Sequence, residues 1–530
     1  MRKRTSNGPA RPRDRHVVSE GFGGSATRSL RDGLSVRGSA ASFVPVNETP
    51  LEDCMNAHAL DEQTDDWFWR RERADRLSVI IDAADFFKAA KDAMLQARHS
   101  ILLIGWDFDA RIDLEPEGKT LDGPNPVGPF LTWLGKRRPE LDIRILKWDT
   151  GMMYSIGRGE TPLTLLRWKL SGPVQMRLDG VHPPLSTHHM KLLVIDEALA
   201  FCGGIDMTTG RWDTRDHAEA SPGRLSPRKA PLGPWHDATT CVTGPAAKAL
   251  SDLARSRWAH ATGKMLGPFA GDFDIWPSDV TVDFENIDVS ICRTVPEHLE
   301  RPQVTEIERA TLATIATARQ RLYIESQYFA SRRIAEAIAE RLAEPDGPEI
   351  LVVNPDTADG WLEAEFMDSS RIRMMQIVRQ ADHNDRFRLV YPVNAAGTPI
   401  YVHAKIMIAD DRLLKIGSAN LNNRSMGYDS ECDLVIESED DPAVAKRIAH
   451  IRDDLLAEHL DLSENAVRDA LADGGSMIAL VDRVSATNGR RLVPLPMREL
   501  SPDEEMLAES NLADPLRPGR LKRTFRKLLG

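Results

Sequence analysis

At 530 residues, with 42% hydrophobic and 28% charged side chains, the chain has a globular composition that excludes a fibrous or wholly disordered protein. Its length predicts about two to four domains. No apolar run approaches the roughly 18 residues of a membrane-spanning helix, and no apolar stretch follows the basic N-terminus. We therefore expect a cytoplasmic protein without a signal peptide or a transmembrane helix.

The net charge of −12 is distributed unevenly along the chain. Residues 1–40 hold nine Lys or Arg against three acids, and residues 515–530 hold six against none. Because each of these segments contributes +6, residues 41–514 carry −24. A core this acidic disfavours broad contact with nucleic acid and favours a small or membrane-borne substrate.

Alternating helix and strand patterns begin near residue 74 and define a first domain, predicted over residues 46–262. Apolar residues at helical spacing predict helices, and short β-branched runs predict strands. The helices are expected at 83–98, 161–170 and 246–258, and the strands at 100–107, 142–148, 174–178 and 190–195. Pro and Gly exclude a regular element from residues 218–234, which we expect to form a surface loop.

The same order of elements recurs in a second domain, predicted over residues 263–485. Its helices are expected at 306–319 and 359–380, and its strands at 321–328, 349–353, 386–391 and 406–408. The similar strand sequences that begin at Ser100 and Arg321 are 221 residues apart. An offset of this length indicates duplication of a whole α/β domain and not a short structural repeat.

Two segments lie outside the predicted domains. Residues 1–45 are rich in Arg, Gly, Ser and Pro and are expected to form a disordered basic arm. Residues 486–530 are expected to form a C-terminal basic tail, in which Leu521, Phe525 and Leu528 have helical spacing among basic residues. This pattern fits either an interfacial helix drawn to anionic lipid or a basic tail with no lipid role.

Each predicted domain carries one copy of the pattern His-x-Lys-x4-Asp. The copies lie 214 residues apart and consist of His189, Lys191 and Asp196, and of His403, Lys405 and Asp410. A pair of small residues begins seven positions after each aspartate, Gly203-Gly204 in one copy and Gly417-Ser418 in the other. Side chains at positions i and i+2 of an extended strand share a face, so each histidine and its lysine are predicted to face one pocket.

Two His-Lys pairs supply what phosphodiester cleavage requires: a nucleophile, a proton donor and fixed positive charge. One imidazole can be neutral near pH 7 while its twin is protonated, particularly if carboxylates tune them apart. We expect one histidine to attack and the other to donate, with Ser418 and Asn420 adding hydrogen-bond donors. No metal or cofactor is expected for this chemistry.

The other histidines and the cysteines are interpreted as structural. His188 is expected on the opposite face from His189, and neither His217 nor His236 is assigned to a site. The five cysteines are widely spaced and form no CxxC pair, so we expect buried free thiols and no metal site; they are Cys54, Cys202, Cys241, Cys292 and Cys432.

The duplicated pattern resembles the HKD signature of the phospholipase D superfamily, and the resemblance covers roughly residues 75–460. Surrounding segments are similar to those of eukaryote-like members: 201–213, 234–237, 323–329 and 416–425. The resemblance implies two tandem α-β-α sandwich domains that form one pseudo-twofold unit with a shared active site. Fewer than 80 residues precede the first domain, so we expect no PX or PH module.

The resemblance also implies roles for individual residues. His189 is expected to form a covalent phosphatidyl-histidine, and His403 to act first as an acid and then as a base. Glu431, 28 residues after His403, matches the orienting carboxylate of the family. In the first half, either Asp213 or Asp216 occupies a similar stretch. The remaining assignments are Asp206 at the position of Asn420, within the catalytic set, and Asp196 and Asp410 as structural residues.

The function implied by the resemblance is phospholipase D activity on the headgroup phosphodiester of a phospholipid, with water or an alcohol as acceptor. Phosphatidylcholine and phosphatidylethanolamine are plausible substrates, and we expect a monomer that contacts the membrane surface. Three alternatives remain open: phosphatidyl transfer between lipids as in cardiolipin synthesis, a metal-independent nuclease, and a non-enzymatic membrane-binding protein. The acidic core argues against the nuclease.

Overall fold

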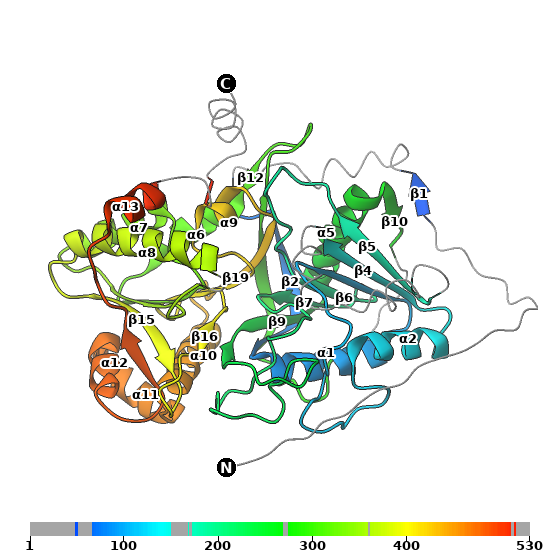
Figure 1. Cartoon of the computed structure of the whole chain (residues 1–530), viewed down its shortest axis with the longest axis horizontal. Coiled ribbons are helices and arrows are strands. Elements are labelled where there is room, and N and C mark those ends of the chain that lie inside the picture. Colours follow the sequence, from blue (N-terminus) through cyan, green and yellow to red (C-terminus); the bar gives the residue numbers. More distant parts are fainter. Residues whose placement is uncertain are drawn as a thin grey trace, which may run out of the picture. The chain divides into compact units, whose positions relative to one another are not determined.

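Strands from both predicted halves join in one continuous sheet (Figure 1). The computed structural model describes residues 48–50, 66–149, 168, 172–268, 274–358, 361–509 and 514–515. The predicted arm 1–45, nearly all of the predicted helix 161–170 and residues 516–530 of the tail lie outside this part of the chain.

The first half contributes seven strands to the sheet, in the order β5 (Val174–Asp179), β4 (Asp142–Trp148), β3 (Ser100–Gly105), β6 (Leu192–Ile195), β7 (Leu199–Gly203), β9 (Ala238–Thr243) and β2 (Arg70–Ile81). The second half continues from β2 with β11 (Phe284–Val295), β19 (Glu431–Glu437), β18 (Leu413–Gly417), β17 (Ile406–Ala409), β13 (Arg321–Glu325), β14 (Glu349–Val353), β15 (Phe387–Val393) and β20 (Arg491–Pro494).

The strand order reads the same outward in both directions from the antiparallel pair β2 and β11. On each side, one long strand is followed by three strands that each run antiparallel to the one before. Next comes β3 or β13, again antiparallel to its neighbour, and then two strands that run parallel to it. A pseudo-twofold axis between β2 and β11 would produce this order. Equivalent positions in the halves are therefore found by counting strands outward from β2 and β11.

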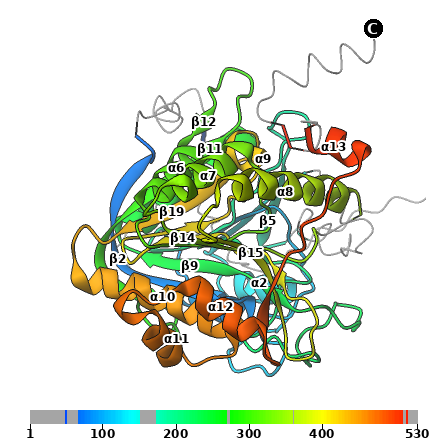
Figure 2. The same ribbon diagram turned by 90° about the vertical axis from the view of Figure 1, so that its left-hand side faces the viewer.

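Helices cover both faces of the sheet in each half (Figures 1 and 2). In the first half, α1 (Ala83–Gln96) and α2 (Val127–Arg137) pack on one face and α5 (Pro245–Thr262) on the other. In the second half, α6 (Glu306–Thr317), α7 (Arg332–Ala343) and α8 (Trp361–Ala381) lie opposite α10 (Pro442–Leu460), α11 (Glu464–Leu471) and α12 (Met477–Ser485). The mixed α/β layers predicted from the sequence are present.

Short elements complete the described part of the chain. They are β1 (Glu48–Pro50), β8 (Trp235–His236), β10 (Lys264–Leu266), β12 (Val304–Thr305), β16 (Tyr401–Val402), α9 (Asn423–Gly427), the 3-10 turn η3 (Ala472–Gly474) and α13 (Pro502–Glu509). Of these, β8 and β16 pair in parallel and join the two halves outside the main sheet. No helix among the described residues is long and apolar enough to cross a membrane.

Burial on both faces explains why the central strands are continuous apolar runs. Every residue of β3 is buried, and so is every residue of β6, β7 and β9. Such runs lack the period-2 alternation of a half-exposed strand, so the sequence predicted β3 and β6 from β-branched and apolar content alone, and it did not predict β7 or β9. The bounds of β4 and β14 agree with the predicted strands 142–148 and 349–353.

The aspartate that ends each His-x-Lys-x4-Asp pattern makes the same backbone contacts in both halves. The Asp196 carboxylate accepts hydrogen bonds from the backbone N–H groups of residues 98–100, at 2.6–2.7 Å. The Asp410 carboxylate accepts the same three bonds from residues 319–321, at 2.7–2.8 Å. Each carboxylate therefore fixes the turn that enters β3 or β13, and neither reaches the histidines.

The fold continues beyond the predicted end of the second domain at residue 485. Residues 491–494 form β20, which pairs antiparallel with β15 and extends the sheet. The predicted C-terminal tail 486–530 therefore begins too early. Its Leu492 is fully buried, but a four-residue strand with one buried side chain gives too weak a pattern to recognise.

The predicted boundary at residue 262 coincides with the end of α5, where Gly263 adopts the left-handed conformation with φ of 73°. Glycine is favoured at this position because it has no Cβ to strain the turn. Cys202, Cys241, Cys292 and Cys432 are buried free thiols, as expected, and Cys54 lies outside the described residues.

Candidate active site

The two motif histidines lie side by side although they come from different halves. His189 precedes β6 and His403 precedes β17, which are equivalent strands in the sheet order. Their ring centroids are 6.4 Å apart, and the ring planes are inclined by 58°. The exposed fraction is 14% for the His189 side chain and 5% for the His403 side chain. One small tetrahedral group can therefore reach both imidazoles.

A carboxylate from the second half orients His189. Nδ1 of His189 lies 3.0 Å from both carboxylate oxygens of Glu431, the first residue of β19. The hydroxyls of Ser418 and Ser425 also donate to Glu431, at 2.6 and 2.7 Å. Burial raises the pKa of Glu431 to about 8, but three donors directed at its oxygens favour the ionised form. With Nδ1 bound in this way, Nε2 of His189 remains for chemistry.

A carboxylate from the first half orients His403 in the reciprocal arrangement. Nδ1 of His403 lies 2.7 Å from Oδ2 of Asp237, which immediately precedes β9. Strand β9 occupies the position in the first half that β19 occupies in the second. The backbone repeats the exchange, because His189 N–H donates to Ser430 and His403 N–H donates to His236. Each half thus supplies the orienting carboxylate for the histidine of the other half.

The expectation that Asp213 or Asp216 orients a catalytic histidine is wrong. Asp213 instead lies 3.0 Å from Nδ1 of His217 and forms an ion pair with Arg224 at 2.8 Å, and Asp216 accepts from Thr214. The prediction failed because it measured spacing from the histidine. The interval is 28 residues from His403 to Glu431 but 48 from His189 to Asp237, since the loop before β8 lengthens it.

Both motif lysines fold back on their own histidines. Nζ of Lys191 donates to the His189 carbonyl at 2.6 Å and lies 3.2 Å from Oδ2 of Asp206. Nζ of Lys405 donates to the His403 carbonyl, and burial lowers the pKa of Lys405 to about 7. An anionic phosphate between the rings would favour the charged form of both lysines.

The small polar residues after each motif differ in what they contact. Asp206 accepts from the backbone of Trp106 at 3.0 Å and thus ties the end of β3 to Lys191. Ser418 donates to Glu431, and Nδ2 of Asn420 lies 3.4 Å from Oε1 of Gln327. Within the described part of the chain, Oδ1 of Asn420 is buried without a hydrogen-bond partner. The Ser418 hydroxyl already donates to Glu431, whereas the Asn420 amide has a second hydrogen to donate, so Asn420 is better placed than Ser418 to bind a phosphoryl oxygen.

An aromatic and cationic group of side chains lies next to His403. Sequence analysis did not assign these side chains to the site. The Trp235 ring stacks on Tyr401, with centroids 4.5 Å apart and planes inclined by 15°, and lies 5.3 Å from the His403 ring. The Arg211 guanidinium lies 4.1 Å above the Trp235 ring. The sequence signal was present in segments 201–213 and 234–237, which were noted only as resemblances.

Burial and nearby cations favour the neutral form of both motif imidazoles. Burial, followed by the nearby charge of Lys191, lowers the pKa of His189 well below its usual value. Burial and Lys405 do the same for the pKa of His403. A neutral imidazole is a nucleophile, whereas a proton donor must first gain a proton. A bound phosphodiester favours that protonation, because its negative charge offsets the lysines.

Gly204 is required by the position of Asp237. A Cβ at residue 204 would lie 2.2 Å from Oδ1 of Asp237 and 3.3 Å from the His403 carbonyl. We predict that Gly204→Ala displaces the carboxylate and lowers kcat by about 100-fold, the loss expected for a misplacement of roughly 1 Å. Gly233→Ala is the matched control, since nothing lies within 4 Å of its Cβ. Equal activity of the two variants would contradict the prediction.

His188 is a buried structural residue with a predicted effect on stability. Its Nδ1 lies 2.9 Å from the Ser430 hydroxyl, and its Nε2 lies 3.2 Å from Asp179, which already pairs with Arg257. Burial lowers the pKa of His188 to about 4. As the pH falls from 6.5 to 4, the unfolded chain gains a proton at this residue and the folded chain does not, so stability falls.

We therefore predict that His188→Gln weakens this pH dependence. The wild-type protein should lose about 2–3 kcal/mol more free energy of unfolding than the variant between pH 7 and pH 4.5. Urea unfolding at the two pH values measures the difference. His383→Gln, at an exposed position, is the control and should keep the wild-type slope. An unchanged slope in His188→Gln would show that His188 takes up its proton in the folded protein over the same pH range as in the unfolded chain.

Comparison with known proteins gives one family match, which lies in the second half of the chain. Residues 311–455 match the family described as "Cardiolipin synthase, PLD-like domain". The chain is 25% identical to phospholipase D A of Dictyostelium discoideum over 442 residues, covering 70% of this chain and 34% of that protein. It is 23% identical to phospholipase D alpha 4 of Arabidopsis thaliana, covering 68% and 61% of the two chains. Residues 311–455 thus match a phospholipase D-like family, and the chain is similar to proteins named phospholipase D.

Other similar proteins carry different names. Cardiolipin synthase A of Cronobacter sakazakii is 25% identical over 280 residues, covering 51% of this chain and 48% of that protein. The solved phosphatidylserine synthase of Haemophilus influenzae overlaps with a TM-score of 0.48 at 12% identity, over 81% of this chain and 97% of the other. That likeness is too weak to bear on function. The chain spans between a third and three-fifths of the length of the first two relatives.

Proposed function

We propose that the protein is a phosphodiesterase that cleaves the headgroup phosphodiester of a phospholipid through a covalent phosphatidyl-histidine. The observation that carries this proposal is the pair of imidazoles from the two halves, 6.4 Å apart and each held through Nδ1 by a carboxylate of the other half. This arrangement leaves two Nε2 atoms for one phosphorus, one to attack and one to transfer a proton.

In the first step, Nε2 of His189 attacks phosphorus and the bond from phosphorus to the headgroup oxygen breaks. Protonated His403 gives its Nε2 proton to the departing oxygen. In the second step, neutral His403 removes a proton from water or an alcohol, whose oxygen attacks phosphorus and releases His189. Two displacements give retention of configuration at phosphorus. The greater exposure of the His189 side chain supports its role as the nucleophile.

The lysines, Arg211 and Asn420 provide charge and hydrogen-bond donors for the phosphoryl oxygens. Buried cations stabilise developing negative charge strongly because little water screens them. Lys191, Lys405, Arg211 and Asn420 are all less than 9% exposed. The stacked rings of Trp235 and Tyr401 form one wall of the proposed substrate site, next to either the headgroup or the acyl chains.

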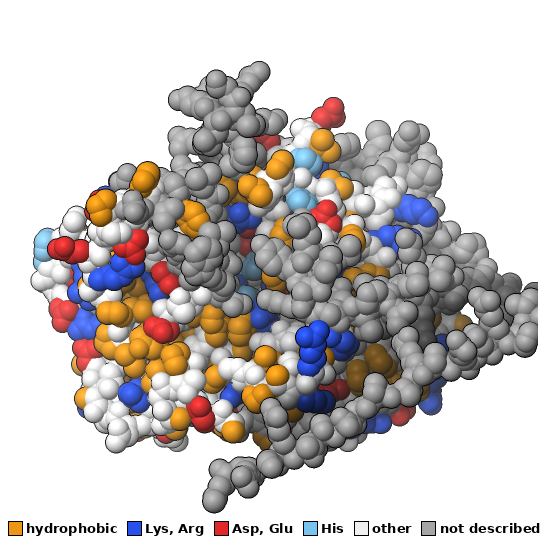
Figure 3. All heavy atoms as spheres, viewed as in Figure 1, with side chains coloured by type: hydrophobic (Ala, Val, Ile, Leu, Met, Phe, Trp, Pro, Cys, Tyr) orange, Lys and Arg blue, Asp and Glu red, His pale blue; other side chains and the backbone are white. Residues whose placement is uncertain are grey.

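Two features support a lipid substrate. Figure 3 shows hydrophobic side chains gathered between charged ones over the region where Figure 1 places β15. Leu185, four residues before His189, is 59% exposed, so the segment that leads to the nucleophile presents an apolar side chain to solvent. Named relatives include phospholipases D and a cardiolipin synthase. Phosphatidyl transfer to a lipid hydroxyl is therefore a second candidate, favoured by the family description over residues 311–455.

A labelled-lipid assay tests the proposal. The purified protein is incubated with vesicles of labelled phosphatidylcholine or phosphatidylglycerol, with and without a primary alcohol. A covalent lipid intermediate predicts phosphatidyl-alcohol in addition to phosphatidic acid, whereas cardiolipin from phosphatidylglycerol alone would assign transfer between lipids. Plasmid cleavage without lipid turnover would assign a nuclease. Vesicle binding without any product would assign a non-enzymatic role and overturn the proposal.

A further inference from the structure

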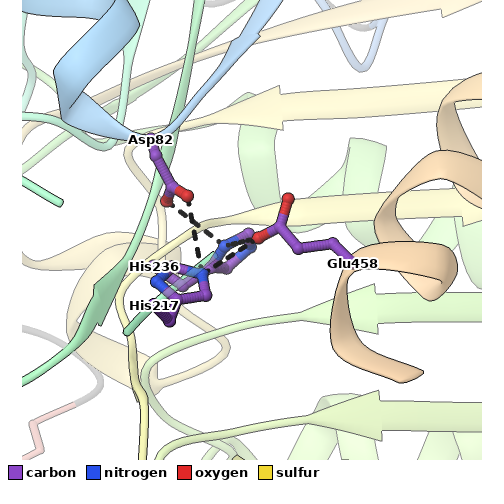
Figure 4. A group of neighbouring side chains, drawn as sticks. All are labelled: Asp82, His217, His236 and Glu458. Carbon is purple, nitrogen blue, oxygen red and sulfur yellow. Dashed lines mark hydrogen bonds and ion pairs between the residues drawn. The ribbon is translucent and has the colours of Figure 1, made fainter. Parts of the chain in front are cut away.

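A second cluster of titratable side chains lies apart from the motif histidines (Figure 4). It consists of Asp82 at the end of β2, His217 in the loop before β8, His236 in β8, and Glu458 in α10. All four side chains are at most 2% exposed. Three of them belong to the first half and Glu458 to the second, so the cluster bridges the halves.

One nitrogen or oxygen atom from each residue points toward a common centre. Nε2 of His217 lies 3.5 Å from Oδ2 of Asp82 and 3.1 Å from Oε1 of Glu458. Nδ1 of His236 lies 3.3 Å from Oδ1 of Asp82 and 2.9 Å from the same Glu458 oxygen. Ligands about 2.0–2.1 Å from a tetrahedral zinc ion are separated by about 3.3 Å, and these four separations, measured with both Asp82 oxygens, lie near that value.

The other ring nitrogen of each histidine is bound by a carboxylate outside the cluster. Nδ1 of His217 lies 3.0 Å from Asp213, and Nε2 of His236 lies 2.9 Å from Glu325. Metal-binding histidines almost always donate their second nitrogen to a carboxylate or carbonyl, which leaves the first nitrogen as a lone-pair donor. Both histidines of the cluster have this arrangement, with the first nitrogen directed at the centre, where Nε2 of His217 is hydrogen-bonded to Glu458.

The carboxylates that support the histidines are themselves anchored. Asp213 also pairs with Arg224, and Glu325 accepts from Nε2 of His459 at 3.0 Å as well as from Tyr323. Such an outer layer fixes both tautomers and both ring orientations. A simple ion pair between a histidine and a carboxylate needs no such layer.

Two atoms of the cluster lack a hydrogen bond although they are fully buried. Oδ2 of Asp82 and Nδ1 of His236 have no hydrogen-bond partner within the described residues. Buried polar atoms without partners are rare and costly. Asp82 also has a φ of 66°, a strained value for a residue with a side chain, and its carboxylate is held in place by the backbone N–H of Asp237 at 3.1 Å.

The charged groups around the centre have an excess of two negative charges. Among the described residues, the carboxylates Asp82, Glu458, Asp213 and Glu325 pair with two arginines, Arg215 on Glu458 and Arg224 on Asp213. Either two additional protons on the histidines or one divalent cation balances this excess. A cation satisfies the two partnerless atoms together, because both point to the same centre.

We propose that Asp82, His217, His236 and Glu458 bind one structural divalent transition-metal ion, with zinc the first candidate. Two imidazoles and two carboxylates form a closed N2O2 set that suits zinc in tetrahedral geometry and suits magnesium or calcium poorly. Four protein ligands leave no position for substrate, so the ion has no part in phosphodiester cleavage. It ties α10 of the second half to the first half and, through Asp82 and the backbone of Asp237, fixes the carboxylate that orients His403.

Metal analysis of the full chain tests this site independently of activity. The protein is produced without a polyhistidine tag, stripped with dipicolinate, and titrated with zinc or with cobalt(II). About one equivalent of zinc should bind per chain, and the zinc-loaded protein should unfold at least about 5 °C above the stripped protein. Cobalt(II) should give the visible absorption of a four-coordinate site with nitrogen and oxygen ligands.

Matched variants locate the ion. Glu458→Gln should abolish stoichiometric zinc binding, and Asp213→Asn, which changes the support of His217 but removes no ligand, should weaken zinc affinity by about 10- to 100-fold. Glu306→Gln removes an equally buried carboxylate, paired with Arg293 outside the cluster, and should retain the full zinc content.

Two results would overturn the proposal. One is wild-type protein that takes up no stoichiometric zinc or cobalt and gains no thermal stability, which would make the cluster a network of protonated histidines. The other is undiminished zinc in Glu458→Gln, which would place the ion elsewhere. If Glu458→Gln fails to fold, the wild-type titration and the cobalt spectrum decide the question without it.

Discussion

His189→Ala is expected to lower headgroup release by about 10⁴-fold or more, because no covalent intermediate can form without the nucleophile. The His189 ring is held by Glu431 and backed by Lys191, so its loss removes one side of the phosphate site without opening the core. Product release from labelled phospholipid vesicles measures the effect. Acid-quenched wild-type protein should also carry lipid phosphate on His189, which mass spectrometry of its peptides detects.

The control for His189→Ala is His383→Ala, an exposed histidine that should retain wild-type turnover. The expected profile is loss of hydrolysis and alcohol transfer together, since both pass through the same intermediate. Loss of hydrolysis alone, or lipid phosphate on another residue of the variant, would show that His189 is not the nucleophile.

His403→Ala is expected to lower phospholipid turnover by about 10²- to 10⁴-fold, the range for removal of a general acid. The loss of activity depends on the leaving group. A nitrophenolate can depart without being protonated, whereas the alkoxide of choline or ethanolamine needs a proton from His403 to depart. A p-nitrophenyl phosphodiester should therefore release about one equivalent of nitrophenol in a burst. Turnover should then stall, because no base activates the water of the second step.

The leaving-group comparison separates the roles of the two histidines. His189→Ala should lose activity on both substrates to the same extent. His403→Ala should retain the nitrophenol burst and accumulate the covalent adduct. If His403→Ala lost the burst as completely as His189→Ala, the assignment of acid and nucleophile would be contradicted. The opposite pattern, with the burst retained in His189→Ala, would exchange the two roles.

The sequence predicted the parts of the site that repeat. Two His-x-Lys-x4-Asp patterns at one offset were visible without coordinates, and the structure places His189 and His403 together. Glu431 was found by its distance from His403 and contacts His189 instead. A motif records which residues recur, but it does not record that each half completes the site of the other.

Asp237 was missed for a related reason. Its partner is 166 residues away, and the long loop before β8 obscured the equivalence of β9 and β19. His217 and His236 were discounted because their ligand partners Asp82 and Glu458 are distant in sequence and show no spacing pattern. Contacts that depend on the sheet order can be derived only after that order is known.

A crystal structure with vanadate tests the central claim most directly, because vanadate adopts the five-coordinate geometry of phosphoryl transfer. The account predicts vanadium bonded to Nε2 of His189, with Nε2 of His403 hydrogen-bonded to the oxygen opposite that bond and Lys191 and Lys405 on the remaining oxygens. Vanadate bound to one imidazole with the other turned away, or bound outside the pair, would contradict the shared site.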